Sequence, residues 1–191
     1  MKTQTIIALK FLLVMTVLTG VIYPFFMTGV AQLVFPAKAN GSLVMQDGKI
    51  IGSELIGQKF DSSIYFWSRP SAIDYNPIPS GASNLGPTSD KLKKQVAERR
   101  KLFATNNSIT DISAIPKEML FASASGLDPH ISPEAAFLQL KRVAMARNLN
   151  ETQKQKVQQL IKNKTQEPQF FLFGEPRINV FELNLALDSI K

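Results

Sequence analysis

Ser125, Asp128 and His130 are the residues whose types best fit catalysis, because a serine, a histidine and a carboxylate make up a hydrolase triad. All three lie in one short run of turn-forming residues, 123–132. The G-x-S-x-G motif would need a glycine where Ser123 stands. A histidine in the same turn is also badly placed to bridge the serine and the acid. The pattern favours a structural turn, with a hydrolase using Ser125 as the alternative.

Metal and phosphate chemistry find little support in the sequence. His130 is the single histidine and there is no cysteine, which excludes thiolate metal sites and disulfides. The chain contains neither G-x-x-x-x-G-K-[ST] nor G-x-G-x-x-G. The small polar run 80–84 could present backbone N–H groups to an anion, but Pro79 precedes it and no helix is expected directly after it. We therefore expect no metal ligand and no firmly bound cofactor.

The element that must position everything else is an uncharged apolar segment, residues 11–35. At about 1.5 Å per residue it would form a helix of roughly 37 Å, longer than the ~30 Å hydrocarbon core of a bilayer. A secretory signal has a shorter apolar region, so cleavage after the A-x-A-like sequence 37–39, which would give a secreted binding protein, is the weaker interpretation. A buried core helix seldom runs so long without a charge. We expect a single transmembrane helix at 11–35, a short cytoplasmic N-terminus at 1–10 and one extracytoplasmic domain at 36–191, so that the alternative hydrolase would be membrane-anchored.

Patterns within residues 36–191 predict an α+β domain. Asp47-Gly48 between apolar runs predicts a hairpin, and the aromatic run 64–67 predicts a strand. The run 170–173 predicts a buried strand, or a segment that packs under one. Residues 69–87 are too interrupted by proline and glycine for regular structure, and such a long loop in a compact domain is usually functional or disordered. The predicted helix starts are Thr88 or Ser89, Ser132, Asn150, and Asn179 or Asn184.

The charge of the chain is modestly positive, with 22 basic and 15 acidic residues and a formal net charge of +7. The densest basic cluster is Arg99-Arg100-Lys101 with three nearby lysines, and no aromatic residues interleave it. A nucleic-acid surface combines basic residues with such interleaving or with a recognised motif. The cluster is therefore predicted to be the solvated face of a helix, and nucleic acid is not expected as a partner.

The two irregular loops, 69–88 and 122–133, resemble in sequence the C subunit of the bacterial potassium-transporting Kdp ATPase, the KdpC family. The resemblance runs in order through nearly the whole chain, anchor included, and Ala82 departs from the glycine associated with the first loop. The matching stretches are Tyr65-Phe66, Arg69-Pro70-Ser71-Ala72 with Tyr75, residues 80–88, residues 122–133, Ala135-Ala136, Arg142-Val143-Ala144, residues 174–180 and Leu183-Asn184.

The resemblance implies a non-catalytic accessory subunit of a high-affinity, ATP-driven potassium import complex. Implied partners are a channel-like potassium-binding subunit, a P-type ATPase catalytic subunit and a small accessory peptide. The implied roles are assembly and a raised ATP affinity of the catalytic subunit, with ATP reached only through the complex. The implied location is the cytoplasmic (inner) membrane, N-terminus inside and domain periplasmic. The candidate contact residues are Arg69, Pro70, Ser71, Tyr75, Ser80, Gly81, Ser83, Asn84, Gly86, Ser125, Gly126, Asp128 and His130.

Overall fold

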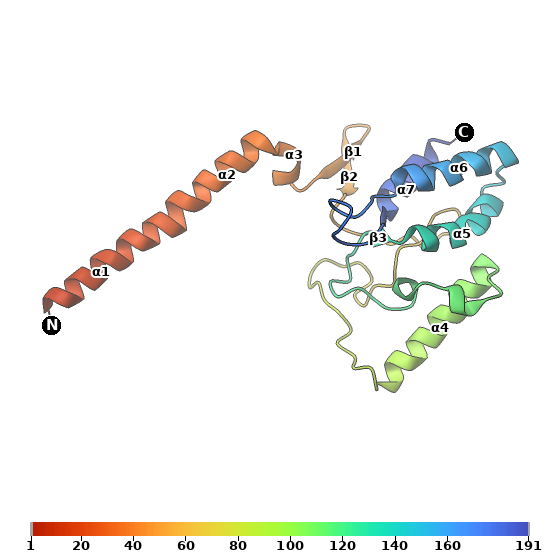
Figure 1. Ribbon diagram of the computed structural model, residues 1–191, viewed down its shortest axis with the longest axis horizontal. Coiled ribbons are helices and arrows are strands. Elements are labelled where there is room, and N and C mark those ends of the chain that lie inside the picture. Colours follow the sequence, from red (N-terminus) through yellow and green to blue (C-terminus); the bar gives the residue numbers. More distant parts are fainter. Residues whose placement is uncertain (1, 191) are drawn as a thin grey trace. The chain divides into compact units, whose positions relative to one another are not determined.

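The computed structural model describes residues 2–190, which form two compact units, one ending at Ser53 and the other beginning at Glu54 (Figure 1). The first unit is dominated by a continuous helical run from Lys2 to Val34 in which no residue is buried. The run is long and apolar enough to cross a membrane. The helix begins earlier than the predicted segment 11–35. The absence of charged residues locates the apolar stretch, but it does not locate the residue at which the helix starts. The parts of the helical run are α1 (Lys2–Val17), the turn η1 (Leu18–Ile22) and α2 (Tyr23–Val34), followed by the short α3 (Pro36–Ala39).

The long helix continues through a proline. Pro24 lacks an N–H and its ring crowds the carbonyl one turn earlier. The preceding turn, η1, is π-helical, a known way of accommodating such an irregularity. The hydroxyls of Thr19 and Thr28 donate to the carbonyls of Met15 and Pro24 at 2.7 and 2.8 Å. Both hydroxyls are therefore paired inside the helix.

The predicted hairpin is confirmed in the first unit. Strands β1 (Leu43–Gln46) and β2 (Lys49–Ser53) pair antiparallel, with Gln46 opposite Lys49. The connecting residues Asp47 and Gly48 both have positive φ, 51° and 75°. Positive φ at both central positions is the requirement of the tight two-residue hairpin turn that Asp-Gly favours.

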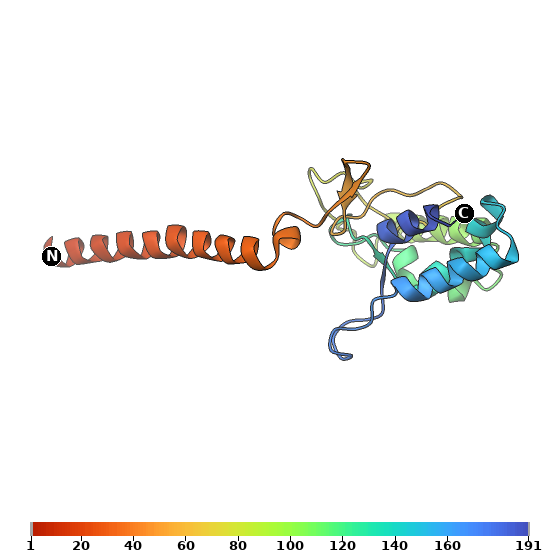
Figure 2. The same ribbon diagram turned by 90° about the horizontal axis from the view of Figure 1, so that it is seen from above.

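The second unit is a helical body with one very small sheet (Figures 1 and 2). Helix α5 packs on α4 and α6, and α6 packs on α7. Strands β3 and β4 pair antiparallel, with Ile131 opposite Ile178. The described elements are α4 (Asp90–Asn107), the 3-10 turns η2 (Ile112–Ala114) and η3 (Lys117–Met119), β3 (His130–Ile131), α5 (Pro133–Ala146), α6 (Glu151–Lys164), β4 (Ile178–Asn179) and α7 (Val180–Asp188). The α+β expectation is confirmed in this coarse sense.

The helix starts follow the predicted capping residues. Ser89 accepts from the Leu92 N–H to cap α4, so Ser89 and not Thr88 is the cap. Asn150 and Gln153 form a reciprocal capping box at α6. Ser132 caps α5, and Asn179, one of the two expected residues, caps α7. These side chains satisfy backbone N–H groups that have no partner within the helix.

The core of the second unit lies between α5, α6 and α7. Residues from all three helices are completely shielded from solvent, and Phe66 inserts among them from an irregular segment. Burying the valine, leucine, isoleucine and phenylalanine side chains among them stabilises the fold by about 1.5–3 kcal/mol each. The fully buried members are Phe66, Ala135, Ala136, Val143, Val157, Ile161, Ile178, Val180 and Leu183.

The strand predicted at 64–67 is wrong, because side chains replace a neighbouring strand. The Asn184 amide accepts from the N–H of Phe66 and donates to its carbonyl, both at 2.9 Å. The Gln139 amide likewise accepts from the N–H of Trp67 at 2.7 Å and donates to its carbonyl at 3.3 Å. The segment is irregular, and the backbone groups of Phe66 and Trp67 are paired with two side-chain amides on helices.

The buried strand predicted at 170–173 is also wrong. These residues form the tip of a loop, 166–177, whose base is closed by backbone pairing of Gln166 with Arg177. The N–H of Phe171 donates to the carbonyl of Pro168 at 3.0 Å, which turns the chain back on itself. Figure 2 shows this loop reaching away from the helices of its unit.

Candidate partner-contact site

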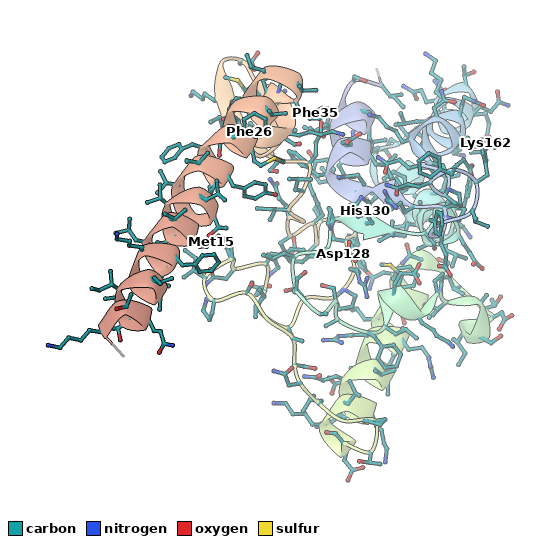
Figure 3. The ribbon with its side chains drawn as sticks, turned by 60° about the vertical axis from the view of Figure 1, so that its left-hand side comes forward. Met15, Phe26, Phe35, Asp128, His130 and Lys162 are labelled. Carbon is teal, nitrogen blue, oxygen red and sulfur yellow. The ribbon has the colours of Figure 1, made fainter. Side chains whose placement is uncertain are left out.

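An ion pair joins the two loops that the sequence singled out. Arg69 Nη1 lies 2.6 Å from Asp128 Oδ2. The other carboxylate oxygen, Oδ1, accepts the N–H of His130 at 3.0 Å and faces its Nδ1 at 3.3 Å (Figure 3). His130 is held in place because it belongs to β3, opposite Asn179 of β4. We call Arg69, Asp128 and His130 the charged cluster; a hollow of about 340 Å³ opens beside it.

The pKa of Asp128 reflects these contacts. Partial burial raises it, but hydrogen bonds from the His130 side chain and backbone, together with the Arg69 charge, outweigh burial and lower the pKa to about 2. The carboxylate is therefore ionised at any physiological pH. Because its pKa is depressed on folding, the charged cluster contributes stability above about pH 4 that is lost as the pH falls towards 2.

The stability of the domain is accordingly expected to depend on Asp128 in acid. Between about pH 5 and pH 2 the wild-type chain should lose up to about 2 kcal/mol more unfolding free energy than the Asp128→Asn variant, which cannot titrate. Urea titrations followed by the fluorescence of Trp67 measure this difference. The control is Asp61→Asn, a side chain that is 79% exposed. Parallel pH profiles for the wild type and Asp128→Asn would contradict the assignment.

The two loops are also joined through their backbones. The N–H of Gly81 donates to the Ser125 carbonyl at 3.1 Å, and the N–H of Ser123 donates to the Pro70 carbonyl at 3.4 Å. Gly126 lies at the closest approach, with φ of +71°. A Cβ atom there would lie 2.5 Å from Ile73 Cγ1 and 2.9 Å from the Gly81 carbonyl oxygen. Glycine is therefore required by both conformation and space.

Hydrogen bonds within the first loop, residues 69–88, fix its shape. The hydroxyl of Ser71 accepts from the N–H groups of Ile73 and Tyr75 at 3.2 and 3.0 Å. The Tyr75 hydroxyl in turn donates to the Arg69 carbonyl. Burial raises the pKa of Tyr75 to about 12, so this hydroxyl keeps its proton. Ser71 and Tyr75 thus shape the loop and position Arg69.

The remaining predicted residues do not converge on the charged cluster. Ser80, Ser83, Asn84 and Gly86 are exposed. The Ser125 hydroxyl accepts the N–H of Leu127 at 3.1 Å. Between residues 2 and 190 no hydrogen bond joins Ser125 to His130, so the triad considered from sequence is not assembled there. Over the same residues, no group of three metal-ligating side chains occurs.

The sequence named Arg142 only within a stretch that carries the resemblance, and its structural role was not predicted. It is 7% exposed and donates to the carbonyls of Ser63 and Tyr65 at 2.6 and 2.9 Å, and to Asn107 Oδ1 at 3.0 Å. Its guanidinium also lies 4.2 Å from the centre of the Trp67 ring. Helical spacing offered a signal, since Gln139 and Arg142 fall on the apolar face of α5.

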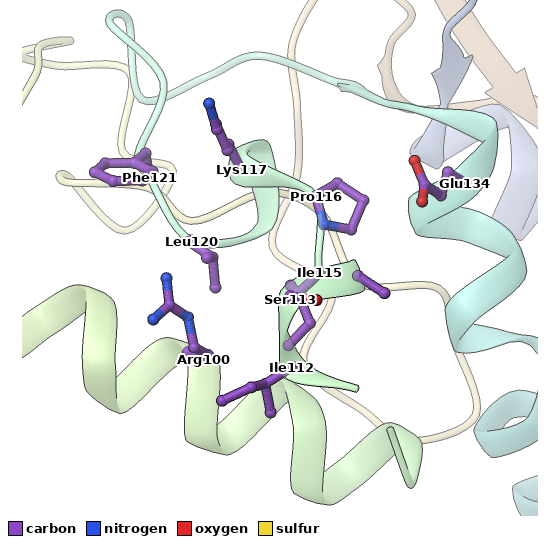
Figure 4. Close-up of a pocket in the computed structure, with 10 residues that line it drawn as sticks. Arg100, Ile112, Ser113, Ile115, Pro116, Lys117, Leu120, Phe121 and Glu134 are labelled. Carbon is purple, nitrogen blue, oxygen red and sulfur yellow. The ribbon is translucent and has the colours of Figure 1, made fainter. Parts of the chain in front are cut away.

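A larger hollow, about 690 Å³, lies between α4, the two 3-10 turns and the start of α5 (Figure 4). Ile112 and Leu120 line it, and the charged residues around it are Arg100, Lys117 and Glu134. None of the predicted contact residues lines this hollow. It is therefore separate from the joined loops.

Comparison with known proteins decides the family. The model of the family described as KdpC, the c chain of K+-transporting ATPase, matches residues 5–189. The chain belongs to the KdpC family. Among KdpC relatives, the "Potassium-transporting ATPase KdpC subunit" of Geobacter metallireducens is 49% identical over 187 residues, covering 96% of both chains. The protein of that name from Polynucleobacter asymbioticus is 48% identical, covering 99% of this chain and all of its own.

Membership of the KdpC family confirms the resemblance noted from the loop motifs. A KdpC chain is a non-catalytic subunit, so the expectation of a non-enzyme is confirmed and the hydrolase alternative fails. It is also a membrane-associated transport subunit with one N-terminal apolar helix. The joined loops are thus to be understood as parts of a subunit that works with others.

Proposed function

We propose that the chain is an accessory subunit of a high-affinity, ATP-driven potassium import complex, needed for the assembly and stability of that complex. Its partners are a channel-like potassium-binding subunit, a P-type ATPase catalytic subunit and a small accessory peptide. The observation that carries the proposal is the family match over residues 5–189, which includes the apolar helix as well as the domain.

The proposed topology is a single span in the cytoplasmic membrane, with the N-terminus in the cytoplasm and the domain on the periplasmic side. The helix supports this because its large apolar side chains are exposed all along it, for example Phe25 at 74% and Leu33 at 86%. A water-soluble unit would bury such residues, whereas a bilayer covers them.

The proposed influence on ATP follows from this topology. A periplasmic domain cannot touch ATP on the cytoplasmic side, so any increase in the ATP affinity of the catalytic subunit must be transmitted through the anchor and its partner helices. Glycine and threonine residues in the span support such contacts, since small and polar residues are typical of helix–helix interfaces in lipid. Gly20 and Gly29 have no other part of the chain within 4 Å of an added Cβ.

We infer that the joined loops, residues 69–88 and 123–132, form the partner-facing surface of the domain. Their inner residues, Arg69, Gly126 and Asp128, fix the shape, and the exposed residues Ser83 and Asn84 are free to meet a partner. Rigid loops lose little conformational entropy on binding, which favours assembly.

The decisive experiment removes the gene for this chain. Growth at limiting potassium should stop, and the complex should no longer co-purify in mild detergent through a tag on the catalytic subunit. The full-length chain should restore both. A Ser83→Trp chain should restore neither fully, whereas Thr152→Trp, exposed on α6, should act like the wild type. Normal growth and an intact complex without the chain would overturn the proposed function.

A further inference from the structure

The tip of the 166–177 loop exposes four consecutive large apolar side chains. Phe170, Phe171, Leu172 and Phe173 are 87%, 91%, 75% and 62% exposed. No other run of this kind occurs in the second unit, within residues 54–190 that the structure describes. Exposed apolar surface of this size marks a site that meets another apolar medium.

The backbone of the loop holds these side chains outward. Gln169 and Phe173 exchange both backbone hydrogen bonds at 2.9 Å, which closes the tip. Phe170 and Phe171 then adopt φ of 55° and 58°, in the left-handed region that bulky residues seldom occupy. Such a conformation persists only where the surrounding structure imposes it, and it is commonest at functional sites.

A positive charge lies directly behind the tip. Arg177 Nη1 is 4.0 Å from the position a Cβ atom would take on Gly174, the residue that follows the apolar run. Among the described residues no carboxylate pairs with this guanidinium, and its Nε is buried without a hydrogen-bond partner. The loop thus presents apolar side chains first and the Arg177 guanidinium behind them, with the exposed carboxylates Glu167 and Glu175 on the two sides of the tip. Arg177 and Glu175 also line the hollow beside the charged cluster.

We propose that this tip inserts into the periplasmic leaflet of the membrane that holds the anchor, with Arg177 against a lipid phosphate. The inference rests on the proposed membrane anchoring, which keeps the domain, with an expected radius of gyration of about 14 Å, next to the bilayer. An apolar group in the acyl region with a cation at headgroup depth is the arrangement of interfacial membrane-binding segments.

The shape of the tip favours lipid over a protein partner. All four side chains are mostly exposed, on a loop that reaches away from the helices of its unit. Acyl chains can surround such a projection on every side. A protein surface would have to provide a deep pocket to cover it equally well.

Spin labelling of the full-length chain in liposomes of zwitterionic and anionic phospholipid tests the proposal. Because the chain has no cysteine, Phe171→Cys and the control Met145→Cys each give a single label site. Met145 is 65% exposed on α5. We expect the label at 171 to be several-fold less accessible to a water-soluble nickel reagent, and several-fold more accessible to oxygen, than the label at 145. Adding Arg177→Gln should bring the label at 171 several-fold closer to aqueous accessibility, whereas Lys162→Gln, on an exposed lysine of α6 (Figure 3), should not.

A label at Met15 in the long helix separates the two proposals. Lipid-like accessibility at 15 with aqueous accessibility at 171 would overturn the insertion and leave the anchoring intact. Aqueous accessibility at both positions would overturn both proposals. The same measurements on the purified complex identify the remaining alternative. If the label at 171 is shielded from the nickel reagent only when partner subunits are present, insertion into lipid is overturned. The tip would then belong to a protein interface.

Discussion

Replacing Arg142 by methionine is expected to lower the free energy of unfolding by about 3–5 kcal/mol, because it removes a donor from both buried and part-buried oxygen atoms. The guanidinium bonds the carbonyls of Ser63 and Tyr65 and the amide oxygen of Asn107. Burial lowers the pKa of Arg142 to about 10, so it is still charged at neutral pH. Urea denaturation of the full chain in detergent, followed by Trp67 fluorescence, reports the loss directly, since the Arg142 guanidinium lies 4.2 Å from the centre of that ring.

The neighbouring residue supplies the control for Arg142. Lys141→Met removes a positive charge from the same helix at an exposed position and should change stability by less than about 0.5 kcal/mol. Arg142→Lys should remain strongly destabilising, because an ammonium group cannot reproduce the planar fork of donors. A loss of less than about 1 kcal/mol in Arg142→Met would show that the carbonyls find other partners.

Gly126→Ala is expected to separate the two loops and to destabilise the domain by about 2–4 kcal/mol. The added methyl group would meet a side chain at 2.5 Å and a carbonyl oxygen at 2.9 Å, at a backbone φ of +71°. Thermal unfolding of the full chain measures the stability change. Co-purification of the complex measures whether the loop surface is needed for assembly.

The control for Gly126 is another glycine of the same surface. Gly86 has nothing within 4 Å of an added Cβ and no positive φ, so Gly86→Ala should leave stability close to that of the wild type. If both variants behaved alike, the close approach of the loops would not explain why glycine occupies position 126. If the Gly126→Ala chain were less stable but the complex still assembled, the partner surface would lie elsewhere.

Local signals in the sequence predicted the parts of the fold that depend on neighbours along the chain. The caps at Ser89, Ser132 and Asn150 and the turn at Asp47-Gly48 are set by short-range hydrogen bonding and φ preferences, and all four are confirmed. The long apolar helix followed from the absence of charge. Its role as a membrane span stays a prediction.

The errors share a physical cause: apolar composition does not tell which groups will satisfy the backbone. The run at 64–67 has strong strand preference, yet amides from Gln139 and Asn184, distant in sequence, take the place of a sheet. The run at 170–173 is as apolar as a core strand, yet tight backbone pairing at its two ends turns it outward. Local propensity is a weak guide where tertiary contacts decide.

The candidate site was predicted in part. The motif residues Arg69, Asp128 and His130 do converge, although no spacing rule shows that they would, since Arg69 and Asp128 are 59 residues apart. Ser83 and Asn84 remain outside that cluster. Their role in binding partners is still a prediction, as is that of the whole loop surface.

The pairing of Phe66 with Asn184 determines when this domain can fold during its synthesis. The two residues are 118 positions apart, and Asn184 belongs to the last helix of the chain. At about 5–20 residues per second, a ribosome needs roughly 6–24 s to pass from one to the other. Throughout that interval the segment around Phe66 lacks the side chain that holds it. The second unit therefore cannot complete its fold until α7 has left the ribosome.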